Sequence, residues 1–216
     1  MITIHPRKVL FTLLVINFAL AAIYIGTQLT QKLEDPFNLD AEANIPAWYS
    51  GAQLLLIAIP AAIRGMQMRE ENPQSHWKFY ILAALACVFL SADEVGMIHE
   101  TIQNIMRDKM SWKLPNGMPA NYVVAPVIYA IIGTILLVIF GKATIGFLKE
   151  SKGRAAIIIG GMMLVGGGAV VDVLLPGKAS IYEHAGEELL ELCGASLMLY
   201  GFLIKLKPVT LEVKSD

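Results

Sequence analysis

Charged residues, cysteines and histidines are all scarce in this chain of 216 residues. Asp, Glu, Lys and Arg make up 16% of the sequence, whereas a soluble domain carries about 25%. The two cysteines, Cys87 and Cys193, lie in apolar stretches where a thiol acts as a small hydrophobic group, so we do not expect a disulfide. The formal net charge of −1 gives no reason to expect a nucleic-acid partner.

Apolar residues, in contrast, make up 56% of the chain and come in long blocks, and the mean hydropathy is +0.58. A helix needs about 20 predominantly apolar residues to cross a bilayer. Because lipid cannot satisfy open backbone groups, apolar blocks of this length are typical of membrane helices. The sequence therefore predicts an all-α integral membrane protein in contact with membrane lipids.

Six such blocks predict six transmembrane helices in a single membrane domain over residues 1–216. The first block could instead be the core of a signal peptide, but its length favours an uncleaved helix. Glycines in the fifth block are expected to let a neighbouring helix pack closely. The expected helices cover about residues 9–29, 46–63, 77–100, 122–140, 155–175 and 180–204, and residues 205–216 are expected to form a mobile tail.

The distribution of basic residues predicts the topology of these helices. If both termini lie in the cytoplasm, the segments on that side hold twelve Lys and Arg residues, and the segments on the other side hold five. Cytoplasmic segments of membrane proteins carry the excess of Lys and Arg. We therefore expect cytoplasmic N- and C-termini, and the short loops favour a prokaryotic inner (plasma) membrane.

Two acidic segments interrupt the apolar sequence, at residues 91–100 (SADEVGMIHE) and 182–193 (YEHAGEELLELC). Each contains a histidine beside a glutamate. An ionisable group at the centre of a bilayer costs about 2.5–3.5 kcal/mol, so such groups are functional candidates. In the expected topology both segments, together with Asp172, lie in the outer leaflet, facing the periplasm or exterior.

The spacing within these segments favours a metal site. Carboxylates stacked three or four residues apart on a helix repel one another unless they are protonated or share a cation. Carboxylates combined with imidazoles suit iron, manganese or zinc, and helix bundles build dinuclear centres from glutamates and histidines. The expected ligands of one or two divalent metal ions are Asp93, Glu100, His184, Glu187 and Glu191.

Other polar residues of the two segments are candidates for supporting roles. Glu94 and His99 diverge to either side of the face that carries Asp93 and Glu100, so they join the same centre only if the helix bends, for which Gly96 offers a place. We expect acid–base catalysis from Glu188, Glu94 and His99, and support of the ligands from Asp172 and Glu183.

Three functions are compatible with such a site. The first is a metal-dependent oxidoreductase or hydrolase that acts on a lipid or another apolar small molecule. The second is a transporter of protons or divalent cations, although the sequence shows few polar groups in the inner halves of the helices. The third is a non-catalytic membrane subunit with a structural metal. Acidic residues near the start of a helix can also simply favour its dipole.

Overall fold

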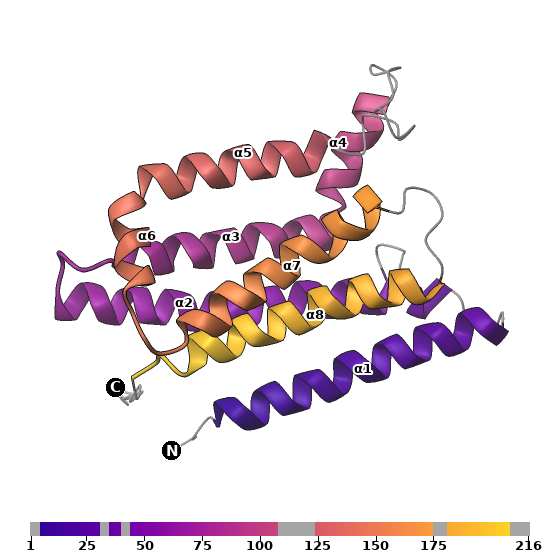
Figure 1. Cartoon of the computed structure of the whole chain (residues 1–216), viewed down its shortest axis with the longest axis horizontal. Helices are drawn as coiled ribbons and strands as arrows, with labels where there is room; N and C mark the ends of the chain where they lie inside the picture. The colour runs from indigo at the N-terminus through magenta and orange to yellow at the C-terminus, as the bar shows by residue number, and fades with distance from the viewer. Residues whose placement is uncertain (1–4, 31–34, 40–43, 108–123, 175–180, 208–216) are drawn as a thin grey trace, which may run out of the picture.

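The computed structural model describes residues 5–30, 35–39, 44–107, 124–174 and 181–207, and these residues form helices joined by short connections (Figure 1). No β-strand occurs among them, so the all-α prediction is confirmed for this part of the chain. The elements are α1 (Pro6–Thr30), the 3-10 helix η1 (Asp35–Phe37), α2 (Ile45–Glu71), α3 (Trp77–Gly96), α4 (Ile98–Arg107), α5 (Val124–Ile139), α6 (Gly141–Leu148), α7 (Arg154–Leu174) and α8 (Ile181–Leu203).

Several of these helices suit a bilayer. Among the described residues, α1, α2 and α3 are each long and apolar enough to cross a membrane. A fourth span results if α5 and α6, which are bent by 84° relative to each other, are counted as one broken helix. Helix α8 falls outside this group because every stretch of it long enough to span includes several glutamates.

The expected helix at residues 46–63 continues to Glu71. Asn44 caps its start, accepting a hydrogen bond from the backbone N–H of Ala47 at 3.1 Å. The helix ends at Asn72, which adopts an extended conformation before Pro73, as a residue preceding proline prefers. The polar residues 64–71, expected as a link, are therefore a helical extension of α2.

The prediction of a single helix over residues 77–100 is wrong at its C-terminal end. Met97 adopts a left-handed conformation with φ of 53°, which ends α3 and starts α4 in a new direction. The helix expected at 122–140 likewise continues, after the bend, as α6. The expected tail begins at Lys205, which is buried, and residues 208–216 lie outside the described residues.

The contacts between helices place α2 at the centre of the bundle. Helix α2 packs against both α3 and α8, while α8 also packs against α1 and α7. Helix α5 runs alongside α3 and is joined to the bundle at its ends, through α4 and α6 (Figure 1). Ile57, Ala61, Tyr80 and Phe202 form the most deeply buried part of the core. Helix α2 thus stands between α3 and α8.

Helices α7 and α8 meet through glycines. A Cβ atom at Gly160 would lie 2.5 Å from the carbonyl oxygen of Gly194, and one at Gly201 would lie 2.9 Å from that of Gly153. Such contacts bring the two backbones as close as helices can pack in a membrane. Gly160 therefore plays the packing role expected from the sequence.

A polar cluster centred on Asn17 joins α1 to the rest of the bundle. The Asn17 side chain is fully buried; its amide nitrogen donates to Ser196 Oγ at 3.0 Å. Its Oδ1 accepts from Tyr49 Oη at 2.7 Å and from Gln53 Nε2 at 3.0 Å. Each of these bonds links α1 to α2 or α8. We call Asn17, Tyr49, Gln53 and Ser196 the Asn17 cluster.

Replacing Asn17 with leucine is expected to lower the free energy of unfolding by about 2 kcal/mol, because Tyr49 and Gln53 lose their acceptor inside the bundle. Thermal unfolding in detergent measures this effect. Thr12→Val on the exposed face of the same helix is the control and should change little. Equal stability of the two variants would mean that the Asn17 cluster does not hold α1 in place.

Candidate functional site

Asp93 and His99 form a close pair at the break between α3 and α4. The left-handed turn at Met97 brings the chain back, so that the backbone N–H of His99 donates to Asp93 Oδ1 at 2.8 Å. His99 Nδ1 lies 3.2 Å from Asp93 Oδ2. Tyr129 of α5 donates from its hydroxyl to Asp93 Oδ1 at 3.0 Å. The buried carboxylate is thus held by three groups from two further helices.

This pairing orients the imidazole. An ionised Asp93 can only accept hydrogen bonds, so Nδ1 carries a proton, and in the neutral imidazole Nε2 then has the free lone pair. A histidine that donates one ring N–H to a carboxylate is the usual arrangement for histidines that bind metals. The bend that His99 needs in order to join Asp93 therefore exists, one residue beyond Gly96. Glu94 lies half-buried beside Ser50 of α2.

The first turns of α8 carry a second carboxylate–histidine pair. His184 Nδ1 lies 3.9 Å from Glu187 Oε2, and the Glu187 side chain is only 13% exposed. The other acids of this stretch, Glu183, Glu188 and Glu191, are also partly buried. Each of these five side chains has further interaction partners. The acidic face of α8 is therefore not a solvated surface.

Both pairs lie at one end of the bundle. Figure 1 shows the C-terminal end of α3, helix α4 and the first turns of α8 at this end, opposite the end where α8 finishes. The glycine pairs of α7 and α8 set an antiparallel register between these two helices. The side chains of Asp172 and Glu100 lie outside the described residues.

The two pairs do not combine into one assembled centre in the described part of the chain. No group of three His, Cys, Asp or Glu side chains there is close enough to hold a metal ion. Helix α2 packs against both α3 and α8, and the rings of Tyr80 of α3 and Phe202 of α8 meet edge to face at the opposite end of the bundle. The structure thus brings together Asp93 with His99 and His184 with Glu187, as two sites.

A further polar cluster, missed by the sequence analysis, lies at the opposite end of the bundle. Glu150, in the connection after α6, accepts hydrogen bonds from His76 and Lys205 and from Tyr80 Oη at 2.7 Å. We call these four residues the Glu150 cluster. Gly146 makes room for it, since a Cβ there would lie 2.6 Å from the Cβ of His76. The sequence signal was Glu150 itself, an acid between basic residues of a short connection.

The charges of Glu150 and Lys205 depend on each other. Burial raises the pKa of Glu150, but the hydrogen bonds from Lys205, His76 and Tyr80 outweigh it and hold that pKa below its usual value. Burial also lowers the pKa of Lys205, and the contact with Glu150 opposes this effect. The pair is therefore an ion pair at neutral pH.

Comparison with known protein families identifies the family of this chain. A family model described as Domain of unknown function (DUF8692) matches residues 9–206. The chain belongs to this family. No curated protein and no solved structure matches it. The DUF8692 domain covers both acidic segments, the Asn17 cluster and the Glu150 cluster, so all of the polar groups described above belong to the domain itself.

Proposed function

We propose that this chain is a membrane protein of six spans, with both termini in the cytoplasm, that binds a divalent metal ion at its acidic end. That end faces the periplasm or exterior of a prokaryotic inner membrane. The observation that carries the proposal is the buried Asp93–His99 pair, in which a carboxylate fixes the orientation of an imidazole. Burial of several carboxylates in one layer requires protons or a cation to offset their repulsion.

The donor set supports iron, manganese or zinc over calcium, because calcium rarely uses imidazole. In this proposal one or two metal ions are bound: at the α8 site by His184 through nitrogen and by Glu187 and Glu191 through oxygen, and at the α3–α4 site by His99 through nitrogen and Glu100 through oxygen. His99, expected from the sequence as an acid–base group, is then a ligand, and Asp93, expected as a ligand, positions it. Glu183 and Asp172 support the ligands from α8 and α7.

The chemistry we propose is oxidation or hydrolysis of a lipid or another apolar molecule that enters from the bilayer. A bound metal of this kind supplies an activated oxygen or water ligand. Glu188 and Glu94, both partly buried, are the candidates for moving protons. A structural metal in a non-catalytic subunit uses the same ligands and differs in having no open coordination position.

Metal analysis of the detergent-purified chain tests this function. We expect near-stoichiometric iron, manganese or zinc, and an affinity about 10–100-fold lower in His99→Ala and His184→Ala. His5→Ala, at the exposed start of α1, is the matched control and should bind as the parent does. A parent chain that binds none of the three metals, or a His5→Ala variant that loses as much, would refute the proposal.

A proton- or cation-conducting role is the second candidate, and the Asn17 cluster favours it. That cluster places polar groups one to two turns inward from the acids of α8, and the Glu150 cluster adds ionisable groups at the other end. Between the two clusters, however, Ile57, Ala61 and Phe202 are completely buried in apolar contacts. Proton flux into vesicles by a chain that binds no metal would favour this candidate.

A further inference from the structure

Arg64 of α2 is half-buried beside Tyr80 of the Glu150 cluster, and two of its donor atoms lack an acceptor. Its side chain is 16% exposed, and its Nε and Nη1 atoms have no hydrogen-bond partner among the described residues. The carboxylate Oε1 of Glu71 lies 3.8 Å from Nη1, too far for a hydrogen bond. The same oxygen is already 2.9 Å from Lys207 Nζ. Leaving such donors unpaired costs about 1–3 kcal/mol or more.

Positive charge exceeds negative charge around this guanidinium. Glu150 already accepts three hydrogen bonds within its cluster, and Glu71 is paired with Lys207. The positive charges of Arg64 and Arg154 each disfavour the charged form of Lys205 and lower its pKa further. Arg154 donates to the backbone carbonyl of Leu148, a neutral acceptor. The described contacts thus leave the cations short of a compensating anion.

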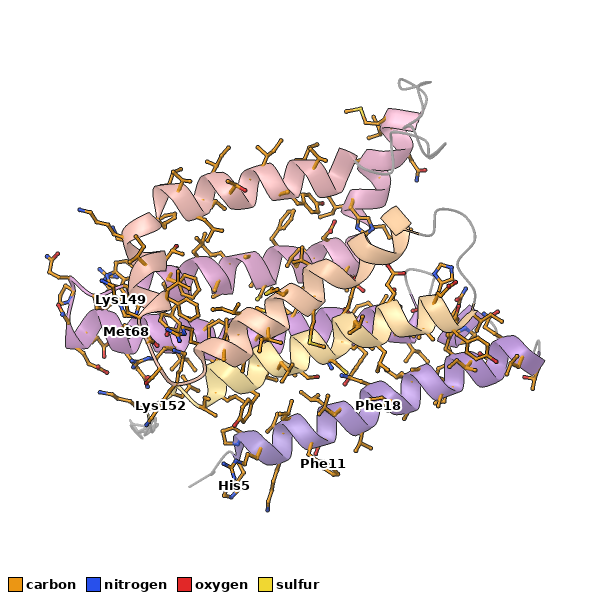
Figure 2. All side chains as sticks on the ribbon, viewed as in Figure 1. His5, Phe11, Phe18, Met68, Lys149 and Lys152 are labelled. Atoms are coloured by element: carbon orange, nitrogen blue, oxygen red, sulfur yellow. The ribbon has the colours of Figure 1, made fainter. Side chains whose placement is uncertain are left out.

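The surroundings of Arg64 suit a headgroup at a membrane surface. Lys149 and Lys152 lie at the same end of the bundle (Figure 2). Lys207 shares Glu71 with Arg64, and two exposed hydrogen bonds of 3.2 Å join its backbone to the Gln67 side chain. Exposed bonds of this kind are worth little, since water replaces them. Lys207 is therefore held loosely enough to turn toward a ligand that binds the guanidinium.

We propose that Arg64, with Lys207 at the rim, binds a phosphate group, supplied by an anionic phospholipid of the cytoplasmic leaflet. A guanidinium offers two parallel N–H donors that match two phosphate oxygens. Basic pockets between membrane helices on the cytoplasmic side bind anionic headgroups in this way. The site lies at the end of the bundle opposite the acidic segments, so it does not depend on the metal.

The test is thermal unfolding of the detergent-purified full chain with phosphatidylglycerol, phosphatidylcholine or inorganic phosphate. We expect phosphatidylglycerol to raise Tm in a saturable way, and Arg64→Gln to weaken that binding tenfold or more. Arg69→Gln is the control, because Arg69 is exposed on the same helix and stacks over Trp77. Lys207→Gln, at the exposed rim, is expected to weaken binding severalfold and serves if Arg64→Gln does not fold.

Each outcome decides the proposal. Stabilisation by phosphatidylglycerol alone supports a lipid site, and stabilisation by inorganic phosphate as well supports an anion site that a lipid headgroup fills. No preference for phosphatidylglycerol over phosphatidylcholine, or equal losses in Arg69→Gln and the Arg64 or Lys207 variants, overturns it. Metal content measured on the same samples should not change, which separates this result from the metal test.

Discussion

Replacing Lys205 with methionine is expected to lower the free energy of unfolding by about 3–5 kcal/mol, because Glu150 would stay buried without its cation. The Lys205 side chain is 2% exposed and that of Glu150 is 19% exposed, so water cannot take the place of the ammonium group. Lys205 also lies over the rings of Tyr80 and Phe147, with its Nζ 5.6 and 5.3 Å from their centroids. Methionine keeps the apolar contact and removes only the charge.

Chemical unfolding in mixed micelles, followed by tryptophan fluorescence, measures this loss. Lys207→Met is the matched control, since the Lys207 side chain is 59% exposed and its ion pair should contribute less than about 1 kcal/mol. The double variant Lys205→Met/Glu150→Gln should recover much of the stability, because the buried charge is then gone. Equal effects of Lys205→Met and Lys207→Met would show that the buried pair does not stabilise the fold.

The pH dependence of the parent chain has a defined sign. The pKa of Glu150 is lower in the folded protein than in the unfolded chain, so its ionised form stabilises the fold above the unfolded value, about 4.3 for a glutamate. That contribution is lost as the pH falls through the lower, folded pKa. The stability difference between the parent and the double variant should therefore shrink below about pH 4.

Hydropathy predicted the helices better than it predicted their ends. The apolar blocks mark where a helix can contact lipid, and each of them is helical in the described residues. The extension of α2 to Glu71 was missed because residues 64–71 are polar and pack against the end of α8. The break at Met97 was missed because no sequence pattern predicts that a residue other than glycine adopts a positive φ.

The candidate site was predictable in its location and less so in its pairing. Two acidic segments flanked by apolar residues were enough to place both at one end of the bundle, as Figure 1 shows. Asn17 and Gln53 could have been found by the same rule, since each is an isolated amide within an apolar run. The Glu150 cluster could not, because its members come from segments far apart in the chain.

Replacing Gly194 with alanine is expected to lower the free energy of unfolding by about 3 kcal/mol, and leucine should separate α7 from α8. A Cβ there would lie 2.6 Å from the carbonyl oxygen of Gly160 and 2.7 Å from the backbone nitrogen of Leu164. Backbone atoms cannot rotate away, so the whole helix must move. Thermal unfolding in detergent measures the loss.

Gly186→Ala on the same helix is the control for that substitution, because a Cβ at Gly186 meets nothing within 4 Å. Glu187 and Glu191 share a helix face with Gly194, at spacings of seven and three residues. A shift of α7 away from that face should therefore reduce metal binding together with stability, whereas Gly186→Ala should leave both unchanged. Loss of stability in Gly194→Ala with full metal binding would mean that α7 contributes nothing to the site.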